Sequence, residues 1–362
     1  MTTPADRVRE LVVRSGMSQG DYALSIGLDP TKLSKSLSGA RRFSSLDLAR
    51  IAERSQVTVD WLLTGAETPL ATAARASRGS STELALAEAG RIVELRESAA
   101  RLGYHQPWAP VPSRSEARRA VSTGVALAGE ALARLSAMDL DPVVLDLAIV
   151  VEKAFGVDVA ITSLGDGFDG LAVATDGVKL ILAALTPVAF RLRFTIAHEL
   201  GHLLAGDDQG VHLDQDVYAR GDNSERRANA FAAVFLMPEP ILRARVVRGF
   251  DQAGFAALAV SLMVSPSALA FRLRELRLID SGAAAAWQGM SAAQAARLAG
   301  AAEAMAAATA YSTEPRRPGL LARDLFAAYL DERTTLRPYA NLLGVDTVTL
   351  RAELERSREV SG

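Results

Sequence analysis

A five-residue motif, His198-Glu199-Leu200-Gly201-His202, constrains the fold of this chain more than any other feature of the sequence. On a helix, residues four apart lie on one face with their Cβ atoms about 5–6 Å apart. Two imidazoles so placed can bind one Zn²⁺ through ring nitrogens at about 2.0–2.1 Å. The motif lies in an apolar segment from about Phe190 to Leu204, and Gly206 is suited to end a helix there. The sequence therefore predicts a helix with a metal site on one face.

The residues near this motif supply the other parts of a hydrolytic zinc site. Glu199 projects beside the two histidines, where its carboxylate can take a proton from an attacking water. A third protein ligand is also needed, and Glu225 is the best candidate because it lies just inside a helix predicted from Ser224, its N-cap, to Leu236. Two alternatives stay open. The motif can arise by chance or be a relic with a structural metal or none, and Glu225 can be a solvated residue favoured by the helix dipole.

Three further polar residues are candidates for supporting roles. Asn229 lies one helical turn after Glu225 and can contact a ligand, although a plain surface amide is an equal alternative. His212 and Tyr218 lie in the predicted loop between the two ligand helices and can stabilise a tetrahedral oxyanion.

Composition restricts the remaining possibilities. The chain has 362 residues, 49% of them hydrophobic, which is enough for two or three compact domains. It has no cysteine, which excludes disulfides and thiolate metal sites. It begins without a signal-peptide pattern and has no run near the ~18 apolar residues that span a bilayer. These features predict a cytoplasmic protein that does not bind membranes. The net charge of −2 means that any DNA-binding surface must be local.

Two segments resemble known families. The stretches RFTIAHELGHLLAGD and ERRANAFAAVFLMP resemble the ImmA/IrrE family of metallopeptidases, and the likeness extends over about residues 140–280. The resemblance implies that His198, His202 and Glu225 bind zinc and that Glu199 is the general base. Residues 18–65 resemble the XRE class of helix-turn-helix repressors, which implies that the third helix, Thr31 to Ser38, enters the major groove of DNA.

The local charge supports a DNA-binding surface in that second segment. Residues 31–54 contain six basic residues (Lys32, Lys35, Arg41, Arg42, Arg50 and Arg54) against Asp47 and Glu53. The polar residues of the third helix avoid its Leu33/Leu37 face and are the candidate base and phosphate contacts. Gln19 at the start of the second helix, and Arg41 with Arg42 after the third, are candidates for positioning the phosphates. An interaction module without DNA affinity is the alternative. The predicted contacts are Gln19, Thr31, Lys32, Ser34, Lys35, Ser38, Arg41 and Arg42.

The predicted fold class is α+β, mostly helical, with an all-α helix-turn-helix domain, a zincin-like domain with a small sheet, and a helical C-terminal region. Strands are predicted at 157–162, 170–175 and 178–182, and a buried helix at 141–157. A weaker helix-turn-helix pattern at 336–355 has little positive charge, which favours packing or dimerisation. The predicted divisions are 1–65 (DNA-binding), 66–82 (linker), 83–137 (helical connection), 138–280 (peptidase) and 281–362 (regulatory or dimerising).

Two functions from different classes fit this pattern. In the first, a zinc endopeptidase cleaves a helix-turn-helix repressor or antitoxin under stress, and its own N-terminal domain places it, as a homodimer, at double-stranded operator DNA. Cleavage in trans is favoured, because cleavage within the accessible linker from Ala66 to Thr82 would only separate the two domains. In the second, the peptidase-like domain only senses a ligand or metal. Glu199 favours the enzyme, since a sensor has no need of a general base.

Overall fold

The computed structural model describes residues 3–55, 57, 61–62, 80–111, 119–165, 167–207, 210–214 and 223–361. The chain divides into two compact units, Met1–Gly79 (unit 1) and Ser80–Gly362 (unit 2). Each unit has a hydrophobic core of its own.

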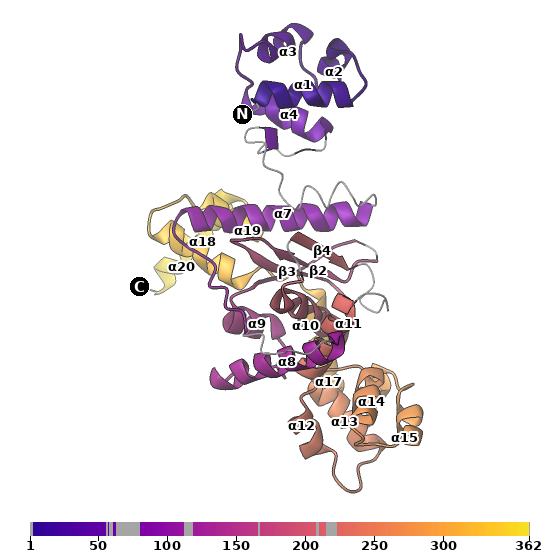
Figure 1. Cartoon of the computed structure of the whole chain (residues 1–362). Coiled ribbons are helices and arrows are strands. Elements are labelled where there is room, and N and C mark those ends of the chain that lie inside the picture. Colours follow the sequence, from indigo (N-terminus) through magenta and orange to yellow (C-terminus); the bar gives the residue numbers. More distant parts are fainter. Residues whose placement is uncertain are drawn as a thin grey trace. The chain divides into compact units, whose positions relative to one another are not determined.

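Unit 1 is helical over its described elements (Figure 1, indigo). Three of its helices begin at capping side chains, because Thr3, Ser18 and Asp29 each accept a hydrogen bond from a backbone N–H in the first turn. Apolar side chains from all of the helices form one core, which includes Tyr22 and Leu33. Of residues 57–63, only Val57, Trp61 and Leu62 are described, and all three are buried. The helices are α1 (Pro4–Arg14), α2 (Gln19–Ser25), α3 (Pro30–Leu37) and α4 (Ser45–Ser55).

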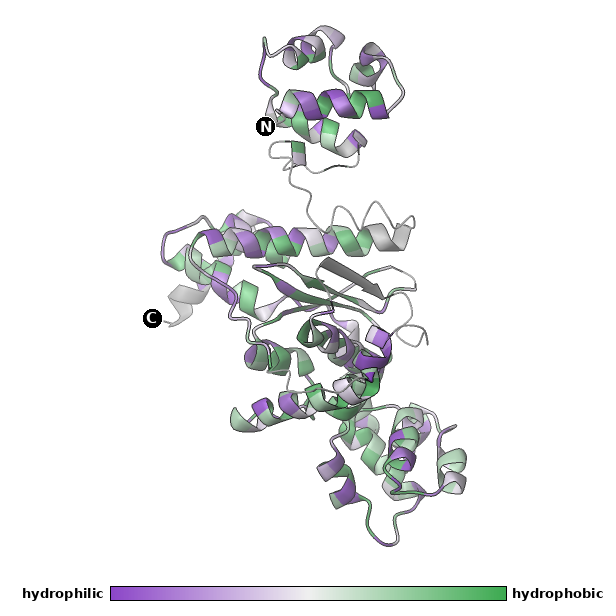
Figure 2. Ribbon diagram, viewed as in Figure 1, coloured by the Kyte–Doolittle hydropathy of each residue, from purple (hydrophilic) through white to green (hydrophobic). Residues whose placement is uncertain are grey.

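Unit 2 contains a four-stranded sheet in the order β1-β3-β2-β4. Strands β1 and β3 are parallel, whereas β2 is antiparallel to both β3 and β4. Figure 1 shows helix α7 along one face of the sheet and helix α10 on the other. Burial on both faces explains the nearly continuous apolar sequence of β2 and β3, which are mostly green in Figure 2. The strands are β1 (Asp158–Thr162), β2 (Gly170–Ala174), β3 (Lys179–Ala184) and β4 (Gly210–Asp214).

The other described elements of unit 2 are helices, so the α+β, mostly helical class is confirmed. Among the described residues no single helix is long and apolar enough to cross a membrane, and α13 and α14 meet that test only as a pair bent by 109°. The helices are α7 (Ser80–Arg101), α8 (Ala120–Ala137), α9 (Leu147–Phe155), α10 (Ala189–Ala205), α11 (Asn223–Leu236), α12 (Glu239–Arg245), α13 (Gln252–Leu262), α14 (Pro266–Glu275), α15 (Ser281–Trp287), α16 (Ala292–Leu298), α17 (Ala302–Thr313), α18 (Gly319–Leu330), α19 (Arg337–Leu343) and α20 (Thr347–Ser361).

Two elements differ from the sequence-based prediction. The helix predicted over 141–157 is α9 and begins only at Leu147, because Asp146 caps it by accepting a hydrogen bond from the Ile149 N–H (3.0 Å). Before it, the Asp141 side chain accepts the Val143 N–H (2.7 Å) and holds a turn that includes a proline. Strand β4 was not predicted, since its sequence, GVHLD, has only two apolar side chains and lies between two helices.

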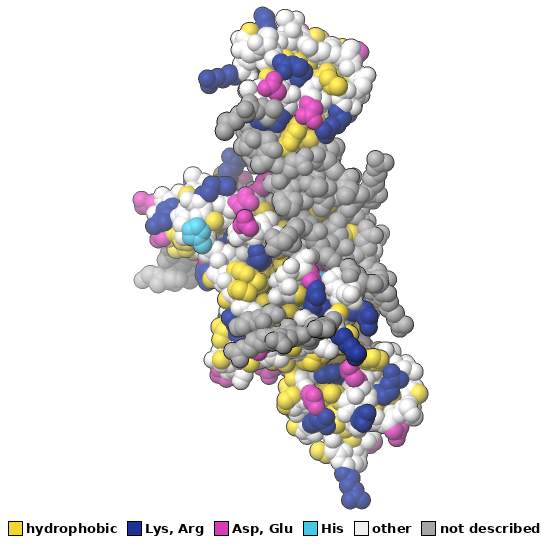
Figure 3. All heavy atoms as spheres, viewed as in Figure 1, with side chains coloured by type: hydrophobic (Ala, Val, Ile, Leu, Met, Phe, Trp, Pro, Cys, Tyr) yellow, Lys and Arg dark blue, Asp and Glu magenta, His cyan; other side chains and the backbone are white. Residues whose placement is uncertain are grey.

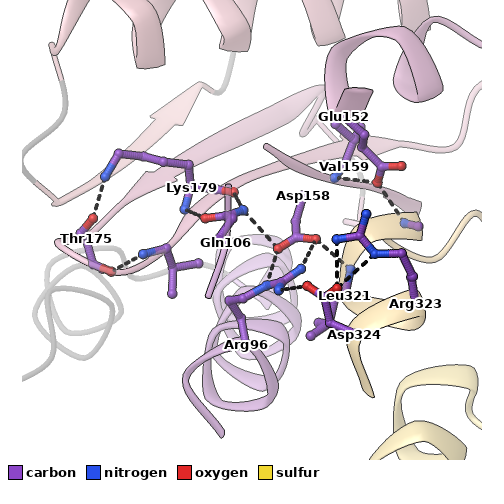
Figure 4. Close-up of polar contacts among 12 residues, drawn as sticks. Arg96, Gln106, Glu152, Asp158, Val159, Thr175, Lys179, Leu321, Arg323 and Asp324 are labelled. Atoms are coloured by element: carbon purple, nitrogen blue, oxygen red, sulfur yellow. Dashed lines mark hydrogen bonds and ion pairs between the residues drawn. The ribbon is translucent and has the colours of Figure 1, made fainter. Parts of the chain in front are cut away.

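A network of buried charges joins the first and the last parts of unit 2 to the sheet (Figure 4). Arg96 on α7 donates two hydrogen bonds to Asp158 on β1 (2.7 and 2.8 Å) and one to Asp324 on α18 (2.6 Å). The side chains of Arg96 and Asp158 have no exposed surface, and that of Asp324 is 7% exposed. We call these three residues the Arg96 cluster. Gln106 bonds both Asp158 and the Lys179 backbone, so the cluster also reaches β3.

One turn geometry recurs among the described residues. In each case a left-handed residue follows a helix, and the next N–H donates back to an alanine carbonyl of that helix before a second helix begins. Three examples have Gly27, Met263 and Gly344 as the left-handed residue, with hydrogen bonds from Leu28 to Ala23 (2.9 Å), Val264 to Ala259 (3.1 Å) and Val345 to Ala340 (3.1 Å). Gly300 and Glu332 follow the same geometry, with hydrogen bonds from Ala301 to Ala296 and from Arg333 to Ala328, both 2.9 Å. The two helices on either side of Met263, α13 and α14, are bent by 109°, within the range of helix-turn-helix pairs.

Candidate metal centre

The helix α10 presents the two histidines of the motif inside the fold. It ends where the sequence predicts, because Gly206 adopts the left-handed conformation (φ 68°, ψ 27°) that closes a helix. Both His198 and His202 are fully buried, and Glu199 between them is also fully buried. The polar side chains of the motif therefore lie in the interior of unit 2 and do not form a solvated face.

The three predicted metal ligands converge. The Nε2 atoms of His198 and His202 are 3.0 Å apart. The carboxylate of Glu225 lies with one oxygen 3.3 Å from His198 Nε2 and the other 3.2 Å from His202 Nε2. All three donor atoms lie within 4.8 Å of one another. We call these residues the metal-donor cluster.

Close packing between helices brings Glu225 to this position. A Cβ atom at Gly201 would lie 3.0 Å from Cδ1 of Phe231, so the glycine inside the motif allows α11 to approach α10. On its other side α11 packs against α8, where a Cβ at Gly124 would lie 2.2 Å from the carbonyl oxygen of Arg227. Helix α11 begins at Asn223, so Ser224 lies within its first turn and is not the predicted N-cap.

The electrostatic setting of Glu225 favours its charged form. Burial raises the pKa of this carboxyl, but hydrogen bonds and charge interactions with His198 and His202 lower it by more. The net result is a pKa well below the usual range, so Glu225 is a carboxylate at neutral pH. Two imidazole nitrogens and one carboxylate oxygen form the His₂Glu donor set of catalytic zinc sites. The residues present therefore fit Zn²⁺.

Glu199 lies at the side of the cluster that faces strand β2. A Cβ at Gly170, the first residue of β2, would lie 3.4 Å from Oε1 of Glu199 and 2.4 Å from Cγ2 of Thr195. The lack of a side chain at Gly170 thus allows the strand to approach α10 next to the glutamate carboxylate. Only a glycine fits there, and the sequence alone gave no sign of this contact.

The structure describes the three predicted supporting residues, Asn229, His212 and Tyr218, only in part. Asn229 is on α11, one turn after Glu225, and is half-buried. His212 is on strand β4 opposite Ala172 of β2, and not in a loop as expected. Its side chain, and Tyr218 as a whole, lie outside the described residues.

Two residues that the sequence analysis did not single out complete the surroundings of the cluster. Oδ2 of Asp207 lies 3.2 Å from Nδ1 of His202, on the opposite side of the ring from the donor Nε2. Its Oδ1 forms an ion pair with Arg227 of α11. The available signal was a carboxylate directly after the helix-ending Gly206, within the stretch that resembles a metallopeptidase.

The predicted DNA contacts in unit 1 are exposed, with one exception. Leu33 and Leu37 of α3 are buried. Figure 3 shows Lys and Arg side chains, in dark blue, on the surface of unit 1. The exposed residues are Gln19, Thr31, Lys32, Ser34, Lys35, Ser38 and Arg42. Arg41 differs, because its guanidinium binds the buried Asp47 (2.8 Å) and the Ser36 hydroxyl (3.1 Å). It therefore holds the segment between α3 and α4.

Comparisons with known proteins match the middle of the chain. Residues 153–274 match the family model of the IrrE N-terminal-like domain, Peptidase_M78. The radiation response metalloprotease IrrE of Deinococcus radiodurans is 38% identical over 127 residues, which are 33% of this chain and 37% of the relative. The chain thus spans little more than a third of the length of this curated relative. These matches confirm the metallopeptidase part of the sequence-based resemblance, and the metal-donor cluster lies within the matched residues.

Proposed function

We propose that this chain is a zinc metalloendopeptidase that regulates transcription, with unit 1 binding operator DNA and unit 2 cleaving a helix-turn-helix repressor or antitoxin in trans. The main observation behind the proposal is the convergence of His198, His202 and Glu225, with Glu199 buried beside them. The name of the relative describes a metalloprotease that acts in a radiation response. It supports both the proteolytic activity and a link to stress.

Each residue of the centre has a distinct task in this proposal. His198, His202 and Glu225 hold the ion, which when bound supplies Lewis-acid activation of the scissile carbonyl and of the attacking water. Glu199 accepts the proton from that water and delivers it to the leaving amide nitrogen. The carboxylate of Glu225 is already ionised at neutral pH, so it binds a cation without first releasing a proton.

Intact mass spectrometry tests the proteolytic activity. The wild-type protein and Glu199→Gln are each incubated, with and without Zn²⁺, with a helix-turn-helix repressor encoded beside the gene of this chain. We expect zinc-dependent fragments of the repressor with the wild type only, while Glu199→Gln still binds zinc. Zinc binding without cleavage would support the sensor alternative. Fragments of this chain broken between Ala66 and Thr82, with the repressor intact, would show cleavage in cis.

The exposed polar face of α3 supports the DNA-binding half of the proposal. Lys32 and Lys35 are exposed on it while Leu33 holds the helix to the core. Binding to an operator should weaken as salt rises, because contacts to phosphates release counterions. Two such units in a homodimer would place their α3 helices about 34 Å apart, one turn of DNA.

A fluorescence anisotropy titration against the upstream region of the gene tests this half. Lys32→Ala/Lys35→Ala should weaken binding and make the salt dependence less steep, by about one in slope for each phosphate contact removed. Arg14→Ala is the matched control, since Arg14 is exposed on α1 and pairs with Glu10. No binding by the wild-type protein to any part of that region would contradict the proposal.

A further inference from the structure

Asp207 occupies a position that depends on how α10 ends. The left-handed Gly206 turns the chain, and the Asp207 N–H then donates to the carbonyl of His202 (3.3 Å). This returns the Asp207 side chain to the last turn of the helix, where it is only 9% exposed. Its carboxylate oxygen Oδ2 then lies 3.2 Å from Nδ1 of His202.

The contact suits His202 as a metal ligand through Nε2. Each ring nitrogen of His202 faces a carboxylate, which only accepts hydrogen bonds: Asp207 lies at Nδ1 and Glu225 at Nε2, both at 3.2 Å. A metal at the cluster would take the lone pair of Nε2, the atom that also lies 3.0 Å from His198 Nε2, and the ring proton would then be on Nδ1, where Asp207 accepts it. The Asp207 carboxylate thus supports the tautomer and the ring orientation that metal binding requires.

Arg227 connects this contact to the third ligand. It forms an ion pair with Oδ1 of Asp207, and its side chain is 22% exposed. Arg227 is on α11, two residues after Glu225. One carboxylate therefore touches the second histidine ligand with one oxygen and the helix of the glutamate ligand with the other.

We propose that Asp207, held by Arg227, is the positioning residue of the metal centre, and that it fixes His202 with Nε2 directed at the ion. The role rests on the proposed function, because it presupposes a metal at the cluster. Carboxylates that bond the distal nitrogen of a ligating histidine typically change metal affinity by about 10–100-fold. Asp207 should contribute an effect of this size without being a ligand, and Arg227 should contribute a smaller one.

Zinc affinity, measured by competition with a chromophoric chelator, is the first test. Asp207→Asn keeps the shape of the side chain but removes its charge, and it should bind zinc about 10–100-fold more weakly than the wild type. The zinc affinity of Arg227→Met should lie between that of the wild type and that of Asp207→Asn. The control is Asp169→Asn. It removes the charge of a carboxylate that pairs with Arg191 of α10 (2.6 Å) and that has no contact with a histidine of the cluster. Zinc affinity in the control should be unchanged.

The ring nitrogens of His202 give a readout that a merely structural role would not change. In ¹⁵N NMR spectra of the zinc-loaded wild type, the His202 ring should bind the ion through Nε2 and carry its proton on Nδ1, and Asp207→Asn should change the Nδ1–H signal because its acceptor changes. Zinc bound through Nδ1 of the wild-type ring would overturn the proposal even if the variants fail to fold. A zinc affinity of Asp207→Asn within twofold of that of the wild type would also overturn the proposal. Wild-type protein that binds no zinc would overturn the proposed function, and the positioning role with it.

Discussion

Unit 2 buries two groups of polar side chains that are built in opposite ways. In the Arg96 cluster, a cation lies between two carboxylates, and each of its contacts is an ion pair of 2.6–2.8 Å. In the metal-donor cluster, two imidazoles and a carboxylate face one another at 3.0–3.3 Å, and every facing atom can donate electrons to a cation. In the first group each carboxylate is paired with a cation, and Arg323 adds a second ion pair to Asp324 (2.8 Å). The second group is arranged around a point where a cation would complete it.

The difference shows how a structural charge cluster can be told from a binding site. Burying an ion costs several kcal/mol, and a protein offsets that cost by pairing. Burial lowers the pKa of Arg96, but its hydrogen bonds to Asp158 and Asp324 and the charges of these carboxylates raise it by more, so Arg96 stays charged. The residues of the Arg96 cluster come from α7, β1 and α18, so the cluster joins three distant elements and stabilises the fold. The metal-donor cluster uses only α10 and α11.

The largest expected effect comes from breaking the Arg96 cluster. Arg96→Met leaves Asp158 buried without its cation and Asp324 paired only with the exposed Arg323, and should lower the free energy of unfolding by about 3–5 kcal/mol. Urea denaturation followed by circular dichroism measures this change, which should not depend on zinc. The control is Arg101→Met on the same helix, where the side chain is 68% exposed. If Arg96→Met lowered the free energy of unfolding by no more than the control does, the cluster would not stabilise the fold.

The next largest effect on stability should come from zinc, and it should require the metal-donor cluster. A metal that binds the folded state alone stabilises it by about 2.7 kcal/mol when its free concentration is a hundred times its Kd. The wild type should bind about one Zn²⁺ per chain, and His198→Ala/His202→Ala should lose both the ion and the stabilisation. Glu199→Gln should keep both, because Glu199 is not a ligand in this assignment. Metal analysis with thermal denaturation measures these outcomes, and full zinc occupancy in the double variant would contradict the ligand assignment.

The same contrast explains what the sequence could predict. The spacing of His198 and His202 fixes their relation through one helix, and the apolar pattern around them predicts that helix nearly to the residue. The Arg96 cluster joins residues 62 and 228 positions apart, and no local pattern indicates that such residues will meet. The strands of the sheet core were predicted from their apolar runs and turns, whereas β4 is of the same length as β1 and β2 but has no apolar run.

Asp207 and the glycines show a second kind of limit. The sequence presents Asp207 as one more polar residue after a helix, and its meaning appears only when Gly206 turns it back to His202. The glycine inside the motif, Gly201, is explained by Phe231 of another helix. Side chains that touch the ligands were predicted from chemistry, but the packing that positions them depends on contacts between distant segments.

A substitution in α8 should disturb the metal-donor cluster without touching it. In Gly124→Ala the new Cβ would lie 2.2 Å from the Arg227 carbonyl oxygen, so α8 and α11 must separate. Overpacking of this kind costs about 1–3 kcal/mol. Because Glu225 and Arg227 are on the displaced helix, zinc affinity should also fall. Chelator competition and urea denaturation measure the two effects, and normal zinc affinity in a destabilised variant would separate the packing from the site.

The smallest effect is expected for Gly129→Ala, also on α8 and about one and a half turns after Gly124. This substitution should raise the stability of unit 2, whereas Gly124→Ala should lower it. Gly129 is exposed, and a Cβ at this position would meet nothing within 4 Å. Gly129→Ala therefore adds no strain and removes conformational freedom from the unfolded chain, which should stabilise unit 2 by about 0.5–1 kcal/mol. Zinc affinity should match that of the wild type, because α11 keeps its place. If Gly129→Ala weakened zinc binding as Gly124→Ala does, the effect would belong to α8 as a whole, and the close approach at Gly124 would not be its cause.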